Sequence, residues 1–314
     1  MENLIFSLNA TIPIFLMMLL GMLFRKLGWM DEVFAAKMNK FVFLVPLPVL
    51  LFEQLATVDF SEVWDIKFIL FCFVVTAISI TISTLISLLW KDRSIKGEFI
   101  QATYRSSAAL LGIAFIQNIY GTAGMAPLMI IGSVPLYNIM AVLVLSFTKP
   151  GQNGMSPELL KKTLKGIVTN PIILGILAGA LWSLLRLPMP TILSKTVSNL
   201  GSLTTPLGLM TMGAAFNWGE AKTGMGPAFV ASFMKLFGLC TLFLPVAVLL
   251  AFREAELIAI LVMLGSSTTV SSYVMARNMG HSGVLSSSIV AITTLGSALS
   301  LTFWLYVLKT LALI

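Results

Sequence analysis

The chain has 314 residues, of which 58% are hydrophobic and 11% are charged, and its mean hydropathy is +0.97. This composition lies outside the range of soluble domains and predicts an all-helical protein that crosses a membrane many times. The net charge of +7 then concerns topology and contact with membrane lipid; nucleic acid is not expected as a partner, because no basic patch is interleaved with aromatic residues.

Apolar runs long enough to cross about 30 Å of hydrocarbon recur along the whole chain. We expect ten membrane-spanning helices, at 5–24, 37–57, 67–90, 97–120, 124–147, 166–186, 192–216, 226–252, 257–279 and 284–311. The longest polar stretch is only about 148–165, which leaves no room for a soluble domain. The first run is not expected to be a cleaved signal peptide, since its basic residues follow the apolar stretch.

The two halves of the chain share residues at a fixed spacing of 158 positions. The pairs are Pro13 and Pro171, Gly21 and Gly179, Lys37 and Lys195, and Pro48 and Pro206. Further along the spacing becomes 160, where Ser107 pairs with Ser267 and Asn118 with Asn278. Each half holds five spans, an odd number, so the second copy must insert upside down. We expect a first five-span repeat at 1–150, a cytoplasmic connecting loop at 151–165, and an inverted second repeat at 166–314.

Positive charge is concentrated in alternate connections between the expected spans. Those after the odd-numbered spans carry Arg25, Lys26, Lys37, Lys40, Lys91, Arg93, Lys96, Lys149, Lys161, Lys162, Lys165 and Lys222, and we assign Arg105 and Arg277 to the same side, at the ends of the fourth and ninth spans. The opposite side holds only Lys67, Arg186, Lys195, Arg253 and Lys309. Because basic loops stay in the cytoplasm, both termini should be extracytoplasmic, across the plasma or inner membrane.

The fourth and ninth spans, which correspond in the two halves, contain hydroxyl-rich stretches beside glycine. Ser106 and Ser107 precede Gly112 in the fourth span, and six of the seven residues after Gly265 in the ninth are Ser or Thr. Such a stretch suits a helix that breaks within the membrane, because hydroxyls satisfy the freed backbone groups and can bind a ligand. Close packing through small residues is the alternative, but two occurrences at equivalent positions favour broken helices.

Several motifs together resemble the auxin efflux carrier family. They are Asn39-Lys40-Phe41-Val42 with Pro48-x-Leu50-Leu51-Phe52, Pro135-Leu136-Tyr137-Asn138 with Ala141-Val142, Pro206-Leu207-x-Leu209 with Gly213-Ala214, Lys235, and Ser272-Tyr273-Val274-Met275-Ala276. In this order and spacing they cover nearly the whole chain. The resemblance implies ten spans in two inverted repeats, with the fourth and ninth broken and crossing, a fold similar to that of bile-acid:sodium symporters.

The resemblance also bears on the branch of the family and on the break itself. The lack of a long central hydrophilic loop is more similar to prokaryotic organic-acid permeases than to plant PIN-FORMED exporters. Ser107 stands where the family often has Asn, and Thr268-Thr269 stands where it commonly has Pro. We therefore expect hydroxyls to hold the crossover open.

Single residues within the spans carry further expectations. Lys235 lies about ten residues, or about 14 Å, into the eighth span, near the bilayer centre. It should either bind an anion, directly or through water, or donate to carbonyls of a broken helix. Asn138 could contact substrate or equally bridge two helices. Pro48 and Pro206 should kink the second and seventh spans.

These patterns predict a secondary transporter, a permease for a small organic anion such as a mono- or dicarboxylate, that works by alternating access. The expected substrate site lies at the crossover and comprises Ser106, Ser107, Gly112, Asn118, Asn138, Lys235, Ser267, Thr268, Thr269, Ser271 and Ser272. Half-helices that begin at the breaks would aim their positive dipole ends at a carboxylate there.

Other classes of function remain as alternatives. A sodium-coupled symporter of an organic acid would use the negative half-helix ends and hydroxyl oxygens, and a non-transporting receptor or sensor is a second alternative. An enzyme is not expected, for want of a general base or hydrolase motif. His281, the single histidine, has no cysteine or carboxylate cluster around it, so neither metal nor cofactor is expected. A homodimer is left open.

Overall fold

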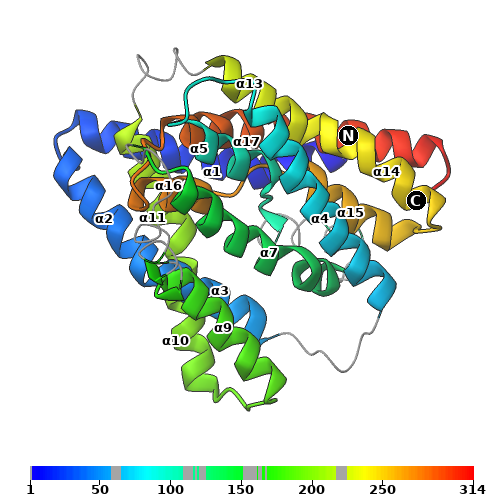
Figure 1. The fold of residues 1–314 in the computed structure, drawn as a ribbon, viewed down its shortest axis with the longest axis horizontal. Helices are drawn as coiled ribbons and strands as arrows, with labels where there is room; N and C mark the ends of the chain where they lie inside the picture. The colour runs from blue at the N-terminus through cyan, green and yellow to red at the C-terminus, as the bar shows by residue number, and fades with distance from the viewer. Residues whose placement is uncertain are drawn as a thin grey trace.

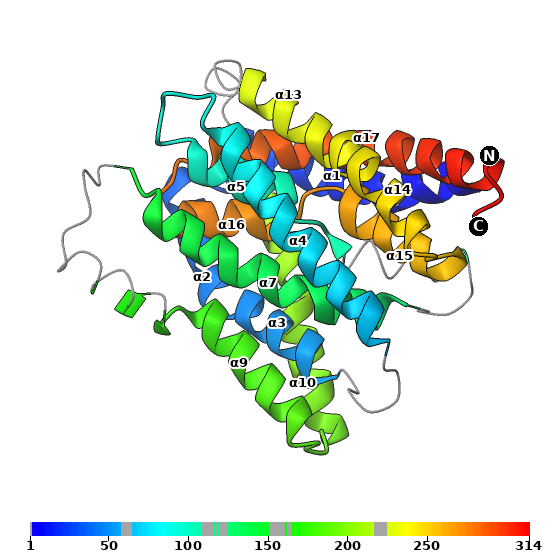
Figure 2. The ribbon, with the colours of Figure 1, turned by 45° about the vertical axis from the view of Figure 1, so that its right-hand side comes forward.

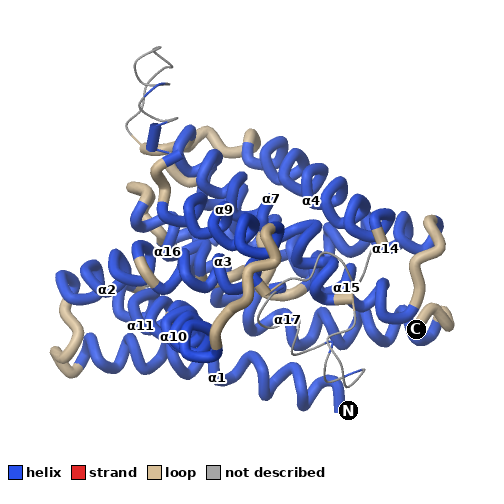
Figure 3. Tube along the Cα trace, turned by 90° about the horizontal axis from the view of Figure 1, so that it is seen from below, coloured by secondary structure: helices blue, strands red, loops and turns tan. Residues whose placement is uncertain are grey.

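The computed structural model describes residues 2–57, 65–108, 116, 119, 125–150, 161, 165–166, 168–216 and 225–314. Within these ranges the chain forms helices and loops and no strand (Figure 3). Five of the described helical stretches are long and apolar enough to cross a membrane: Glu32–Ala56, Ile66–Ser87, Ala126–Phe147, Met225–Leu249 and Val284–Thr310. The prediction of an all-helical, multi-pass membrane protein is therefore confirmed.

The helices follow the expected apolar segments in chain order (Figure 1). They are α1 (Glu2–Lys26), α2 (Glu32–Leu44), α3 (Pro46–Ala56), α4 (Ile66–Ser87), α5 (Lys96–Tyr104), α7 (Ala126–Phe147), α9 (Pro171–Leu184), α10 (Thr191–Ser202), α11 (Thr204–Ala215), α13 (Met225–Phe233), α14 (Leu239–Leu249), α15 (Glu254–Gly265), α16 (Ser271–Asn278) and α17 (Val284–Thr310). A π-helical turn, η2 (Met234–Gly238), joins α13 to α14.

Two of the apolar segments are interrupted just before the repeated prolines. The chain passes from α2 to α3 at Val45 and from α10 to α11 at Leu203, and each interruption lies three residues before Pro48 or Pro206. A proline lacks the N–H that would bond the carbonyl four residues earlier, and its ring crowds that carbonyl. Both segments are therefore interrupted close to the repeated prolines, 158 residues apart, and at Val45 the directly following Pro46 contributes as well.

Two close helix contacts occupy equivalent positions in the two halves. Gly21 of α1 lies against the backbone of Met210 in α11, and Gly179 of α9 lies against the backbone of Phe52 in α3. Gly21 and Gly179 are 158 positions apart, and so are Phe52 and Met210. In Figures 1 and 2, α9 runs beside α3 accordingly. The spacing of 158 positions thus recurs in one pair of helix contacts.

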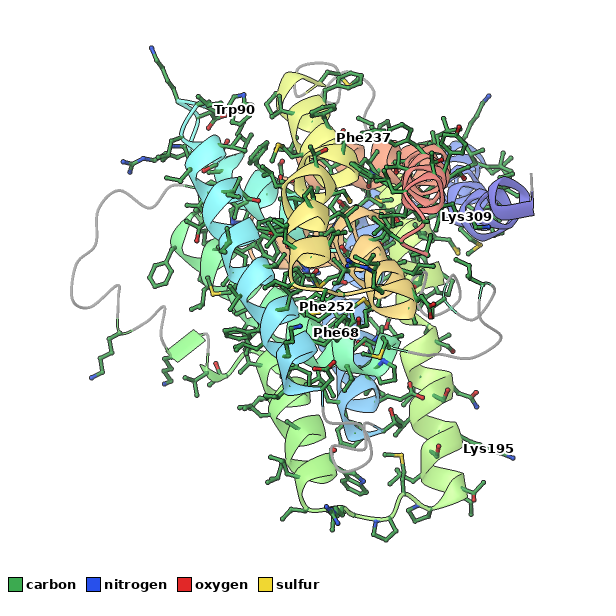
Figure 4. All side chains as sticks on the ribbon, turned by 90° about the vertical axis from the view of Figure 1, so that its right-hand side faces the viewer. Phe68, Trp90, Lys195, Phe237, Phe252 and Lys309 are labelled. Carbon is green, nitrogen blue, oxygen red and sulfur yellow. The ribbon has the colours of Figure 1, made fainter. Side chains whose placement is uncertain are left out.

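The start of α1, the end of α17 and the α14–α15 connection lie at one end of the molecule in Figures 1 and 2. The Glu254 N–H donates to the carbonyl of Leu313 over 3.1 Å. The rings of Phe68, at the start of α4, and Phe252 meet edge to face with centroids 5.7 Å apart (Figure 4). These contacts join helix ends that the charge pattern assigns to the extracytoplasmic side.

The opposite end gathers the starts of α5 and α17 and the end of α7. The Glu98 carboxylate is fully buried and accepts from the N–H groups of Gly283 and Ser286, each at 2.8 Å. It thereby satisfies free donors at the positive end of the α17 dipole. His281 Nε2 lies 2.9 Å from the carbonyl of Leu145. All these groups belong to the side that the charge pattern assigns to the cytoplasm.

Candidate functional site

Two helix breaks meet in the middle of the bundle. α5 ends just before Arg105, whose backbone is extended (φ −75°, ψ 136°). α15 ends just before Ser266, which is also extended (φ −71°, ψ 163°), and α16 begins at Ser271. The Ser107 N–H donates to the carbonyl of Ser267 over 2.9 Å, so two residues that correspond in the repeat contact each other here. The predicted break in the ninth span is confirmed, and α5 stops where the fourth span was expected to break.

Hydroxyl side chains replace helical hydrogen bonds that the breaks remove, and an amide side chain links the two broken segments. Thr268 Oγ1 donates to the carbonyl of Ala102 at 2.7 Å, and the Thr268 N–H donates to Thr293 Oγ1 at 3.0 Å. Gln101 Nε2 donates to the carbonyl of Ser272 at 2.8 Å. Backbone groups at membrane depth need such partners because water is scarce there. The expectation that hydroxyls hold the crossover open agrees with this geometry.

Lys235, on η2, is fully buried and points at the break in the ninth span. Its ammonium donates to Ser106 Oγ and to the carbonyls of Leu264 (2.6 Å) and Met263 (3.3 Å). An ammonium has three N–H donors, and these three oxygens accept them. Of the two roles that the sequence left open for Lys235, the structure shows the one in which it bonds to broken-helix carbonyls.

Arg105 is the cation at the centre of the site. It is 2% exposed, with Nη2 2.7 Å from Asn138 Oδ1 and 3.4 Å from Ser271 Oγ. Nη1 lies 3.1 Å from Gln101 Oε1 and 2.9 Å from Met275 Sδ. No carboxylate among the described residues lies within ion-pair distance of it, and its Nε has no hydrogen-bond partner there. Within the described part of the chain, the guanidinium therefore carries a buried charge whose neighbours are neutral.

The assignment of Arg105 to the cytoplasmic end of a span is wrong. Because α5 starts at Lys96, Arg105 lies nine residues, or about 13 Å, along the segment. That depth is similar to the depth expected for Lys235, so the same count from the start of the span could have identified Arg105. Treating every basic residue near a loop as a topology signal hid it.

A cavity of about 40 Å³ opens beside this guanidinium. Leucines of α3 form an apolar wall, and the rest is polar. The lining residues are Leu47, Leu50, Leu51, Gln54, Arg105, Ser106, Ser107, Val134, Tyr137, Asn138, Thr269 and Ser271. A water molecule needs roughly 10–15 Å³ of such space, so the cavity can hold about three water molecules. One positive side chain, hydroxyls and two amides thus face a small cavity.

The structure brings together most of the residues predicted for a substrate site, in two layers. Those that line the cavity are Ser106, Ser107, Asn138, Thr269 and Ser271. Those that support it from behind are Lys235, Ser267, Thr268 and Ser272. Gly112 and Asn118 lie outside the described residues. The sequence analysis did not include Arg105 and Gln54, which also line the cavity. Among the described residues, no group of His, Cys, Asp or Glu side chains could hold a metal ion.

Apolar helices that surround two broken segments with a polar centre define a multi-pass membrane protein of the solute-carrier kind. A family model described as membrane transport protein matches residues 6–305. The chain belongs to this family, the auxin efflux carrier family that its motifs resemble, and is a transporter, not an enzyme. It is similar to an uncharacterized transporter from Methanothermobacter thermautotrophicus, with 24% identity over 310 residues that cover 96% of this chain and 98% of the relative.

Proposed function

We propose that this transporter carries a small organic anion by alternating access and binds it in the cavity where the two breaks meet. The observation that carries the proposal is Arg105, a buried guanidinium on the cavity wall without a carboxylate partner among the described residues. A charge at this depth costs several kcal/mol unless it is paired or hydrated. A bound carboxylate would pair it, and a planar guanidinium fits the two oxygens of that group.

The charge and shape of the cavity favour a monocarboxylate within this class. Arg105 is the cationic residue on the lining, whereas the Lys235 ammonium is already bonded to three protein oxygens. A second carboxylate would therefore enter the site without a counter-charge. The hydroxyls of Ser271 and Thr269 bond to each other at 2.8 Å, which leaves one of their two protons to donate to the first carboxylate, and the α3 leucines accommodate an apolar remainder. Asn138, bonded to Arg105, holds the guanidinium in place.

A thermal-shift screen of the purified protein tests this proposal. We expect short monocarboxylates to raise the unfolding temperature and their amides to have no effect, because a ligand that binds only the folded state stabilises it. Dicarboxylates should give a smaller shift at equal concentration. A response to the amides as strong as to the acids would contradict the anion proposal. Uptake of the labelled acid into proteoliposomes would then distinguish transport from sensing.

We also propose that the two halves, 1–150 and 166–314, are inverted repeats with both termini extracytoplasmic. The equivalent contacts of Gly21 and Gly179 support the repeat. The start of α1 and the end of α17 lie together, opposite the α4–α5 and α16–α17 connections, which supports an even number of crossings (Figures 1 and 2). Among the described basic residues, Lys149 lies against Gly280, next to His281, and Lys96 begins the helix that carries Glu98.

Cysteine labelling of intact cells tests this orientation. Glu254→Cys should react with a membrane-impermeant thiol reagent added outside, and Arg93→Cys should react only after the cells are opened. Both positions are exposed in the protein. The native Cys72 and Cys240 are fully buried and should give little background. The reverse labelling pattern would overturn the orientation, and labelling of both from outside would overturn the alternation of loops.

A further inference from the structure

The Lys235 ammonium donates its hydrogen bonds to oxygens of the protein itself. Lys235 is 0% exposed, and its ammonium contacts Ser106 Oγ, Leu264 O and Met263 O. It lies within hydrogen-bond distance of both broken segments, since Ser106 follows the end of α5 and the two carbonyls belong to the last turn of α15. No carboxylate of the described chain lies within ion-pair distance of Lys235.

Two of the oxygens around Lys235 are carbonyls that the helix break frees, Leu264 O and Met263 O, and Met263 O also accepts from Tyr137 Oη at 3.2 Å and from Ser106 Oγ. In a continuous helix the carbonyls of Met263 and Leu264 would accept from N–H groups four residues later. The Thr268 N–H, which would serve Leu264, instead donates to Thr293 Oγ1. Carbonyls at a helix C-terminus carry the negative end of the helix dipole, and at membrane depth they need a donor or a cation. Clustered carbonyl and hydroxyl oxygens are also the ligands that hard monovalent cations prefer.

We infer that Lys235 is a tethered cation that takes the place of a bound monovalent metal ion and holds the two breaks together. The ammonium supplies the positive charge that Na⁺ or K⁺ would otherwise bring to these oxygens. Through Ser106 it also positions the neighbouring Arg105, so it acts on the cavity without contacting the substrate. This inference rests on the proposed function, because it takes the crossover as the transport site. It favours a transport cycle in which no sodium ion binds at the position of the Lys235 ammonium.

The test measures the thermal unfolding of the purified full chain without substrate, in NaCl, methylammonium chloride or choline chloride at equal ionic strength. The wild-type midpoint should be the same in all three salts. Lys235→Ala should lose the cation and leave a space, and its midpoint in choline should fall by roughly 5 °C or more. Na⁺ or methylammonium should restore at least half of that loss, whereas choline is too large to enter.

Two matched variants separate a missing cation from general damage. Lys235→Met should be destabilised to a similar extent but should not respond to either small cation, because its side chain fills the space. Lys195→Ala, at an exposed position on α10, should behave as wild type in every salt (Figure 4).

Three results would overturn the inference. They are equal Lys235→Ala midpoints in all three salts, equal rescue of Lys235→Met, and failure to obtain folded Lys235→Ala when Na⁺ or methylammonium is present throughout purification. Because all readings are made without substrate, a failure of carboxylates to bind would contradict the proposed function and leave this result unaffected.

Discussion

Arg105→Gln should lower the affinity for a carboxylate roughly ten- to a hundred-fold. A hydrogen bond to a charged group contributes about 1.5–3 kcal/mol, and glutamine keeps a polar side chain but loses the charge and the forked donors. The carboxylate with the largest thermal shift serves as ligand, and its dissociation constant is measured by titration of purified, monodisperse protein. Removing Arg105 costs its bonds to Asn138 and Gln101 but also relieves the burial of an unpaired charge, so the change should affect ligand affinity more than folding.

Three further variants make that result specific to the cavity. Arg93→Gln, at an exposed position in the α4–α5 connection, should bind as wild type does. Ser271→Ala should weaken binding several-fold, since its hydroxyl lines the cavity. Thr268→Val should lower thermal stability with little change in affinity, because its hydroxyl bonds to Ala102 behind the cavity. An unchanged dissociation constant in Arg105→Gln would remove Arg105 from the substrate site.

The positions of the helices and of their interruptions could be predicted from the sequence. Runs of apolar residues determine where helices can cross hydrocarbon, and proline removes a backbone donor wherever it stands. The hydroxyl-rich stretch after Gly265 likewise indicated a broken helix, and Thr268 satisfies backbone groups there as expected. Each of these properties is local, so the chain itself reveals them.

The roles of the two buried cations could not be predicted in the same way. Both Lys235 and Arg105 lie deep in the bundle, but which one faces the cavity depends on the direction of η2 and on where α5 stops. The partners of Lys235 are main-chain carbonyls, which have no signature in the sequence. The sequence therefore indicated a polar, cationic centre, but it did not show that Arg105 lines the cavity while Lys235 lies behind it.

Glu98 illustrates the same limit from the opposite charge. It is fully buried, and its partners are backbone N–H groups of Gly283 and Ser286, almost 190 positions away in the chain. Nothing local to Glu98 shows that the start of α17 lies beside it. A helix N-terminus becomes a carboxylate partner only once the bundle is assembled, because the contact depends on the packing of α5 against α17.

Gly21→Ala and Gly179→Ala should each destabilise the folded protein by about 1–3 kcal/mol, the usual effect of forcing extra volume into a packed contact. A Cβ at Gly21 would overlap the carbonyl of Met210, and one at Gly179 would lie 2.6 Å from the carbonyl oxygen of Phe52. Backbone cannot rotate aside as a flexible side chain does, so α1 and α11, or α9 and α3, must separate. The measurement is the thermal unfolding midpoint and the monodisperse fraction in detergent.

Gly226→Ala provides the matched control, since a Cβ there meets no atom within 4 Å and alanine is the better helix former by about 1 kcal/mol. It should be neutral or slightly stabilising. If Gly21→Ala were as stable as Gly226→Ala, the close approach of α1 to α11 would be contradicted.

The losses of stability in Gly21→Ala and Gly179→Ala, compared with each other, test the repeat itself. If the two halves are repeats, equivalent contacts should respond alike, so a large loss at Gly21 with none at Gly179 would show that the halves pack differently despite their shared spacing.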